Sequence, residues 1–160
     1  MPDASFGAPK SLRVTSNAFK DGAMIPPKHT CTAKDVSPPL AIEAVPATAK
    51  ALAFIMDDPD APRGTWTHWT WWNLPTAKHN LPEGADIRSL GGREGRTDFG
   101  DSGYGGPCPP SGTHRYFFKA YAVDGRLNVP ADASRADLEQ ALRGHVVAWG
   151  ELMAKYAHLS

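Results

Sequence analysis

Residues 51–56, ALAFIM, form an unbroken apolar run between Lys50 and an acidic stretch that begins at Asp57. A short apolar run with charges at both ends is typical of a strand buried on both faces of a sheet. Such a strand needs neighbouring strands and further layers over both faces, so the run predicts a domain built around a central β-sheet. The chain of 160 residues is long enough for one such domain.

Several other segments predict strands around this run. Threonine and aromatic residues favour strands at 67–74 and 114–123, and alternating apolar residues favour shorter ones at 12–19 and 41–45. The segment 145–156 fits a helix or a strand by periodicity alone.

The remaining segments predict one helix and extensive loops. Ser134 is a typical cap for a short helix that ends at Gly144. Residues 75–111 are rich in glycine and proline, which predicts a long loop region of the kind that usually carries function. Residues 1–11 lack periodicity and predict a flexible N-terminal arm before a single domain over 12–160. We therefore expect a mainly-β domain with one or two short helices.

Charge and hydropathy exclude several classes of protein. The chain has 17 Lys and Arg residues against 17 Asp and Glu residues, without the basic excess that nucleic-acid binding requires. No apolar run approaches the roughly 20 residues of a membrane-spanning helix, and the N-terminus lacks the apolar core of a secretory signal. We expect a cytoplasmic protein with no nucleic-acid partner.

Cys31 and Cys108 are the only cysteines. No second pair completes a zinc site, and a single long-range disulfide is the alternative to two free thiols. Because we expect a cytoplasmic location, we predict two buried or partly buried thiols.

Three polar clusters follow or precede the predicted strands. The sequence DDPDAP at 57–62 places three carboxylates after the apolar run, and its prolines fix the backbone there. His68 lies between tryptophans, where a purely structural histidine is the common case. The loop 103–112 is dense in glycine and proline, which suits close backbone approach to an anion. An acidic surface turn is the plain alternative for 57–62.

These clusters predict a small anion-binding pocket if they meet. His114 and Tyr116 are two positions apart, so on a strand they share a face and Arg115 takes the other. With His68 and Asp58 beside them, imidazoles and a phenol can donate to an oxyanion while the carboxylate fixes one imidazole tautomer.

Competing chemistries fit the sequence less well. Two histidines and a carboxylate can bind iron, but here they come from separate segments without a helical HExxH spacing. Neither Ser102 nor Ser111 lies in a nucleophile elbow, and the glycine-rich loop lacks the Lys-Ser/Thr of a P-loop. We expect no cofactor and no metal ion.

Four motifs in order resemble one known family. They are SPPL at 37–40, DDPDAP at 57–62, the aromatic-flanked His68 and GPCPPSGTHRYFF at 106–118. Together they resemble the phosphatidylethanolamine-binding protein family, in particular its bacterial and archaeal Raf-kinase-inhibitor-like branch, over residues 12–157. The resemblance implies a large antiparallel sheet packed on a smaller one with short peripheral helices, and it makes 144–151 a strand.

The resemblance also implies a function and a site. In the family, a pocket at one end of the sheet binds phosphate-like anions and phosphoethanolamine-type head groups. The matching positions here are Asp58, Pro59, Asp60, His68, Gly106, Pro107, His114 and Tyr116. A homodimer is a further expectation from the family's prokaryotic branch.

The leading hypothesis is therefore a protein that binds a small phosphate-like anion or a phospholipid head group, with a regulatory role and no turnover. A phosphate beside Asp58 is a like-charge pair, so we expect anion affinity to rise as pH falls from about 8 to about 6. Two alternatives stay open: a hydrolase or isomerase that uses Asp58 with a histidine as acid and base, and a protein-binding scaffold.

Overall fold

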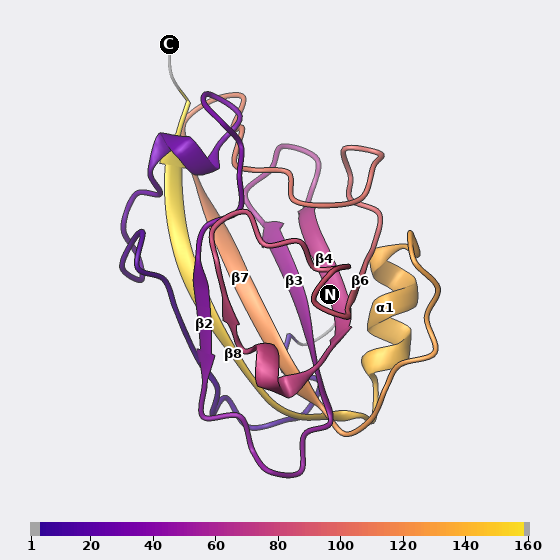
Figure 1. Ribbon diagram of the computed structural model, residues 1–160. Helices are drawn as coiled ribbons and strands as arrows, with labels where there is room; N and C mark the ends of the chain where they lie inside the picture. The colour runs from indigo at the N-terminus through magenta and orange to yellow at the C-terminus, as the bar shows by residue number, and fades with distance from the viewer. Residues whose placement is uncertain (1–3, 159–160) are drawn as a thin grey trace.

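The chain folds into two antiparallel sheets, seen in a computed structural model that describes residues 4–158 (Figure 1). Within this range the larger sheet has five strands in the order β6-β4-β3-β7-β8, and the smaller has three in the order β1-β2-β5. The larger sheet comprises β3 (Ala51–Asp58), β4 (Trp66–Leu74), β6 (Arg93–Glu94), β7 (Thr113–Val123) and β8 (Val146–Ala157). The smaller sheet comprises β1 (Arg13–Thr15), β2 (Leu40–Glu43) and β5 (Asn80–Leu81). The expected mainly-β class with a large and a small sheet is confirmed.

The apolar run is the central strand of the larger sheet, as predicted. Every residue of β3 is buried, and the strand pairs with β4 on one side and β7 on the other. The strand extends beyond the apolar run through Asp57 and Asp58, which both pair with partners in the neighbouring strands.

Alternate residues of β3 pack into two different cores. Phe54 and Met56 point to the face covered by the smaller sheet, where they share a core with Ile42. Ile55 points to the opposite face and shares a core with Leu138 of the helix α1 (Arg135–Leu142). Figure 1 shows β2 and α1 lying on different sides of the larger sheet. Adjacent residues of β3 therefore face different surroundings.

The predicted helix is confirmed, with its predicted cap. The Ser134 side chain accepts a hydrogen bond from the Asp137 amide at 3.2 Å, and Gly144 follows the helix with a positive φ of 82°. Two single-turn 3-10 helices, η1 (Pro27–His29) and η2 (Thr76–Lys78), complete the helical content of the described residues.

Two predicted strands differ in length from the structure. The strand expected at 12–19 is confined to β1, and the strand expected at 144–151 continues through β8 to Ala157. The loop region 75–111 contains only the short elements η2, β5 and β6. Both short strands pair at sheet edges, where two residues are enough to continue a ladder.

The N-terminal segment lies against the larger sheet over its described part. Phe6 packs edge-to-face on Tyr121 with ring centroids 5.3 Å apart. The Trp149 amide donates to the Pro9 carbonyl at 3.0 Å, and the Leu12 amide donates to the Trp149 carbonyl at 3.0 Å. Residues 1–3 of the predicted arm lie outside the described residues.

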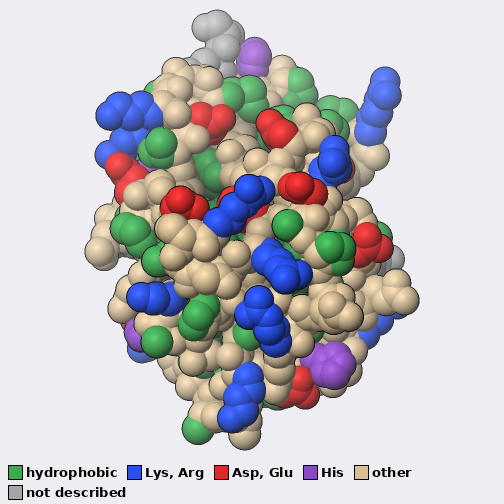
Figure 2. All heavy atoms as spheres, turned by 45° about the vertical axis from the view of Figure 1, so that its right-hand side comes forward, with side chains coloured by type: hydrophobic (Ala, Val, Ile, Leu, Met, Phe, Trp, Pro, Cys, Tyr) green, Lys and Arg blue, Asp and Glu red, His purple; other side chains and the backbone are tan. Residues whose placement is uncertain are grey.

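The surface carries both signs of charge. Figure 2 shows Lys and Arg side chains interspersed with Asp and Glu over the face that includes α1, as expected for a chain with zero formal net charge. Over residues 4–158, no helix has the length and apolar character needed to span a membrane.

Candidate functional site

The sequence-predicted site residues come from strand ends that meet at one edge of the larger sheet. Because the strands are antiparallel, the end of β3 lies beside the beginnings of β4 and β7, with Asp58 paired to Trp66. The end of β8 reaches the same edge, since His114 pairs with Tyr156. This edge lies toward the C-terminus in Figure 1.

A pocket of about 260 Å³ opens at this edge. Four of the predicted site residues line it: Asp58, His68, His114 and Tyr116. The rest of the wall is mostly apolar and comprises Ala61, Pro62, Trp66, Phe99, Cys108 and Pro110. A few polar groups inside an apolar wall are typical of a small-molecule site.

Asp58 and His114 form a buried carboxylate–imidazole pair. Nδ1 of His114 lies 2.6 Å from Oδ2 of Asp58, and the two residues are 6% and 3% exposed. The other carboxylate oxygen accepts the Asp60 amide at 2.8 Å. Because a carboxylate accepts, Nδ1 carries the proton, and Nε2 is the His114 nitrogen left for a ligand.

His68 is fixed in the same tautomer by the backbone. Its Nδ1 donates to the Gly105 carbonyl at 2.6 Å, and the Gly105 amide donates back to the His68 carbonyl at 3.0 Å. Burial lowers the pKa of His68, against the opposing effects of the Gly105 carbonyl and the Asp58 and Asp57 carboxylates. The ring is therefore neutral at pH 7, with its Nε2 lone pair available.

Tyr116 contributes a ring that contacts both imidazoles and a buried hydroxyl. Its ring contacts His68 edge-to-face at 5.2 Å and stacks on His114 at 6.4 Å. The hydroxyl oxygen has no hydrogen-bond partner among the described residues. Burial, with the Asp58 carboxylate, raises the pKa of Tyr116 against the opposing effect of the nearby Cys108 backbone amide, so the group remains a donor. A buried hydroxyl without a partner is costly, which points to a partner supplied by a ligand or water.

Asp60 and Pro59 lie outside the pocket wall. Asp60 forms a two-pronged ion pair with Arg115, whose Nε and terminal nitrogen lie 2.9 and 2.8 Å from the carboxylate oxygens. The Arg115 side chain lowers the pKa of Asp60 to about 2. Pro59 lines a cavity on the opposite face of the sheet.

Gly106 and Pro107 connect the loop to the turn after η1 instead of lining the pocket. The Gly106 amide donates to Asp35 Oδ1 at 2.9 Å, and a Cβ at Gly106 would clash with that carboxylate and with the His29 carbonyl. The Pro107 carbonyl accepts the Cys31 amide at 3.1 Å. Glycine is thus required here for close contact between two loops.

Phe99 is the lining residue that lies outside all of the clusters singled out in the sequence. It is 46% exposed and contacts Trp66 and His68 edge-to-face at 5.6 and 5.2 Å. Its position follows from the path of the loop region, which hydrophobic periodicity does not predict. An isolated aromatic residue between polar neighbours was the only signal in the sequence.

The prediction of two free thiols was wrong, because Cys31 and Cys108 form a disulfide with their Cα atoms 5.5 Å apart. The loop of residues 103–108 folds over the turn that follows η1, which brings together cysteines 77 positions apart. The sequence prediction depended on an assumed compartment and had no information on this loop contact.

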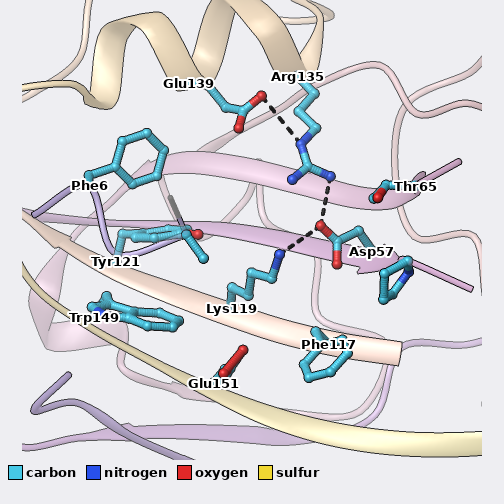
Figure 3. Close-up of a pocket in the computed structure, with 12 residues that line it drawn as sticks. Phe6, Asp57, Thr65, Phe117, Lys119, Tyr121, Arg135, Glu139, Trp149 and Glu151 are labelled. Carbon is cyan, nitrogen blue, oxygen red and sulfur yellow. Dashed lines mark hydrogen bonds and ion pairs between the residues drawn. The ribbon is translucent and has the colours of Figure 1, made fainter. Parts of the chain in front are cut away.

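A second cavity, also about 260 Å³, lies on the opposite face of the sheet (Figure 3). Lys119 of β7 and Arg135 of α1 converge on Oδ2 of Asp57, at 2.8 and 2.7 Å. Arg135 also reaches Glu139 at 3.5 Å, and the remaining wall is largely aromatic. Both cations are committed to a carboxylate, so this cluster joins α1 to the sheet and presents no free charge to an anion.

Comparisons with known proteins agree with this architecture. Residues 15–157 match the family described as phosphatidylethanolamine-binding protein. The chain is 46% identical over 153 residues to the UPF0098 protein PH1269 of Pyrococcus horikoshii, covering 91% of this chain and 76% of that protein.

Two solved structures share the fold and the sequence. A structure titled as a putative phosphatidylethanolamine-binding protein homolog, CT736 of Chlamydia trachomatis, has a TM-score of 0.88 at 39% identity and covers 94% of this chain and 99% of that one. Escherichia coli YbcL, described as a member of the mammalian PEBP family, has a TM-score of 0.85 at 34% identity, with coverages of 93% and 99%. With the sheet architecture and the matched motifs, these similarities lead to one conclusion: the chain belongs to the phosphatidylethanolamine-binding protein family.

Proposed function

We propose that the pocket binds a small phosphate-like anion or a phosphorylated head group such as phosphoethanolamine. One observation carries this proposal: among the described residues, no hydrogen bond is found for the Nε2 atoms of His68 and His114 or for the buried hydroxyl of Tyr116, whose ring contacts both imidazoles. A phosphate oxygen is the acceptor that a phenol and protonated imidazoles recognise.

Proton uptake accompanies this binding. Both imidazoles donate through Nδ1, so a neutral ring offers only a lone pair at Nε2. An anion needs a donor there, and the Asp58 carboxylate beside it adds repulsion. The complex forms when an imidazole is protonated or when the ligand carries its own proton, and both conditions are met more easily as pH falls. This is the origin of the predicted rise in affinity on acidification.

The dimensions of the pocket favour a head group over a whole lipid. A volume of about 260 Å³ lies below the usual range for drug-sized ligands of about 300–1,000 Å³. The exposed rings of Trp66 and Phe99 stand at its mouth and can contact the apolar part of a ligand. The pocket wall therefore accommodates a phosphate with a short substituent.

Calorimetric titration of inorganic phosphate and phosphoethanolamine at pH 6 and pH 8 tests the proposal. We expect tighter binding at pH 6, and a loss of about tenfold or more in His68→Ala and in His114→Ala, because each removes one charge-assisted hydrogen bond. His145→Ala is the matched control, since this exposed histidine bonds Asp124 away from the pocket. Wild-type protein that gives no heat with either ligand at millimolar concentration would contradict the proposal.

The Asp58–His114 hydrogen bond also supports a second candidate, an acid–base enzyme acting on a phosphorylated compound. Release of inorganic phosphate from phosphoethanolamine over time, abolished in Asp58→Asn, would favour the enzyme over the binding protein. The homodimer remains a prediction, which light scattering over a range of concentrations tests.

A further inference from the structure

The disulfide joins a surface turn to the wall of the binding pocket. Cys108 lines the pocket with His68, His114 and Tyr116, while Cys31 lies in the turn after η1. On its other side, Cys108 borders a groove of about 280 Å³ that Cys31 also lines. One covalent bond therefore lies between the pocket and a second surface hollow.

The residues before and after Cys108 differ in the hydrogen bonds that hold them. Residues before Cys108 are tied by hydrogen bonds from the Tyr104 hydroxyl to the His29 carbonyl at 2.7 Å and from the Gly106 amide to Asp35 at 2.9 Å. After Cys108, Pro109 and Pro110 have no amide hydrogens to donate. His158 donates the hydrogen bonds found there, from its Nδ1 to the Pro109 carbonyl at 3.0 Å and from its amide to the Gly112 carbonyl at 2.8 Å.

Both cysteines are exposed, so a thiol reagent can reach the bond. Exchange begins when a thiolate attacks one sulfur of an accessible disulfide. With a dithiol as reductant, the protein disulfide takes up two electrons and two protons to give two cysteine thiols, and the dithiol becomes its own cyclic disulfide.

We propose that the Cys31–Cys108 bond is a redox control on the pocket, oxidised for tight anion binding and reduced for weak binding. This inference rests on the proposed function and names its regulation. Reduction leaves the ties of Tyr104, Gly105 and Gly106 in place and so keeps His68 positioned. It removes the one covalent link from the segment that carries Cys108 and Pro110, two residues of the pocket wall. That segment is then held only by the Cys31–Pro107 hydrogen bond before it and by the His158 hydrogen bonds after Cys108.

The size of the effect depends on the fraction of reduced protein in which the pocket wall is complete. If the freed segment completes the pocket wall in only about one-tenth of the molecules, the apparent affinity falls about tenfold. The fold persists, because both sheets and their cores lie outside the released segment.

The test compares phosphate binding by oxidised protein, by protein in excess dithiothreitol and by the double variant Cys31→Ser, Cys108→Ser, with circular dichroism confirming that each is folded. We expect binding about tenfold weaker in the reduced protein and in the double variant, and no response of the variant to dithiothreitol. Equal affinity in folded oxidised and reduced protein would overturn the inference while leaving the proposed function intact. Loss of the whole fold on reduction would also overturn it, because the bond would then be a general structural link.

A readout without ligand separates the two proposals. The His68 and His114 ring signals in nuclear magnetic resonance should shift on reduction, since the wall beside them moves. If oxidised protein binds no phosphate, the proposed function fails and the redox control of binding fails with it. If binding is seen but these signals do not move on reduction, only the redox inference fails.

Discussion

The two faces of the larger sheet use neighbouring aspartates in different ways. Asp57 lies on the face covered by α1, where Lys119 and Arg135 share one of its oxygens. Asp58 lies on the other face, where it accepts a hydrogen bond from the single imidazole of His114. Successive side chains of a strand point to opposite faces. Two adjacent carboxylates of one motif can therefore have different roles, one structural and one in the candidate site.

The largest expected effect is on the Asp57 face. Asp57→Asn leaves Lys119 and Arg135 without their common anion, and these side chains are only 12% and 22% exposed. Removing one partner of a buried ion pair costs about 3 kcal/mol or more, so we expect a loss of that size in the free energy of unfolding from urea denaturation. Phosphate affinity of the folded variant should change far less than in His68→Ala, because the effect of Asp57 on the pKa of His68 is smaller than that of Asp58. A variant as stable as the wild type would contradict the structural role.

The matched substitution on the other face, Asp58→Asn, should change binding more than stability. The amide can donate to Nδ1 of His114, which moves the imidazole proton to Nε2 and supplies a donor for an anion at neutral pH. It also removes the like charge. We expect tighter phosphate binding than wild type at pH 8 and a smaller difference between pH 6 and pH 8. An unchanged pH dependence in calorimetric titration would show that Asp58 does not control this proton.

A smaller effect is expected on the pH dependence of the free energy of unfolding, through His68 of the pocket. Because burial lowers the pKa of His68 in the folded protein, the unfolded chain binds this proton more readily. The stabilising contribution of neutral His68 is present above the unfolded pKa of about 6.5 and is lost as pH falls below it. In urea denaturation, the free energy of unfolding should fall less between pH 8 and pH 5 in His68→Gln than in the wild type. An equal loss in both proteins would assign it to other groups.

The smallest effect is expected at the rim. Arg115→Met removes the partner of Asp60, so the pKa of Asp60 should rise from about 2 toward its ordinary 3.8. Nuclear magnetic resonance titration of the Asp60 carboxyl measures this change. The pair is partly exposed, so the free energy of unfolding at pH 7 should fall by less than about 1 kcal/mol. If Arg115→Met lowered the free energy of unfolding as much as Asp57→Asn, the exposed ion pair would contribute as much as the buried one, contrary to this account.

The longer strands could be predicted because their apolar and aromatic side chains indicate which segments are buried. The apolar run of β3 and the aromatic residues of β4 and β7 predict a central sheet, and Ser134 predicts the beginning of α1. Short edge strands such as β6 could not be predicted, because two residues carry no periodicity.

The candidate site could be predicted in part for the same reason. His68, His114 and Tyr116 lie on strands, where alternation fixes the face of each side chain. Phe99 and the Cys31–Cys108 bond depend on how two loops cross, and loop paths have no sequence period. Gly106 was predicted to allow close backbone approach to an anion, whereas its close contacts in the structure are with Asp35 and His29.

The central claim is that two imidazoles, each donating a hydrogen bond through Nδ1, form an anion site. Proton uptake on anion binding tests this claim most directly. Calorimetric titration of phosphate at pH 7 in two buffers of different ionisation enthalpy gives the number of protons exchanged on binding. The account predicts uptake of about one proton per phosphate, with the value reduced in His114→Ala and unchanged in His145→Ala. Binding without proton uptake, or with proton release, would contradict it.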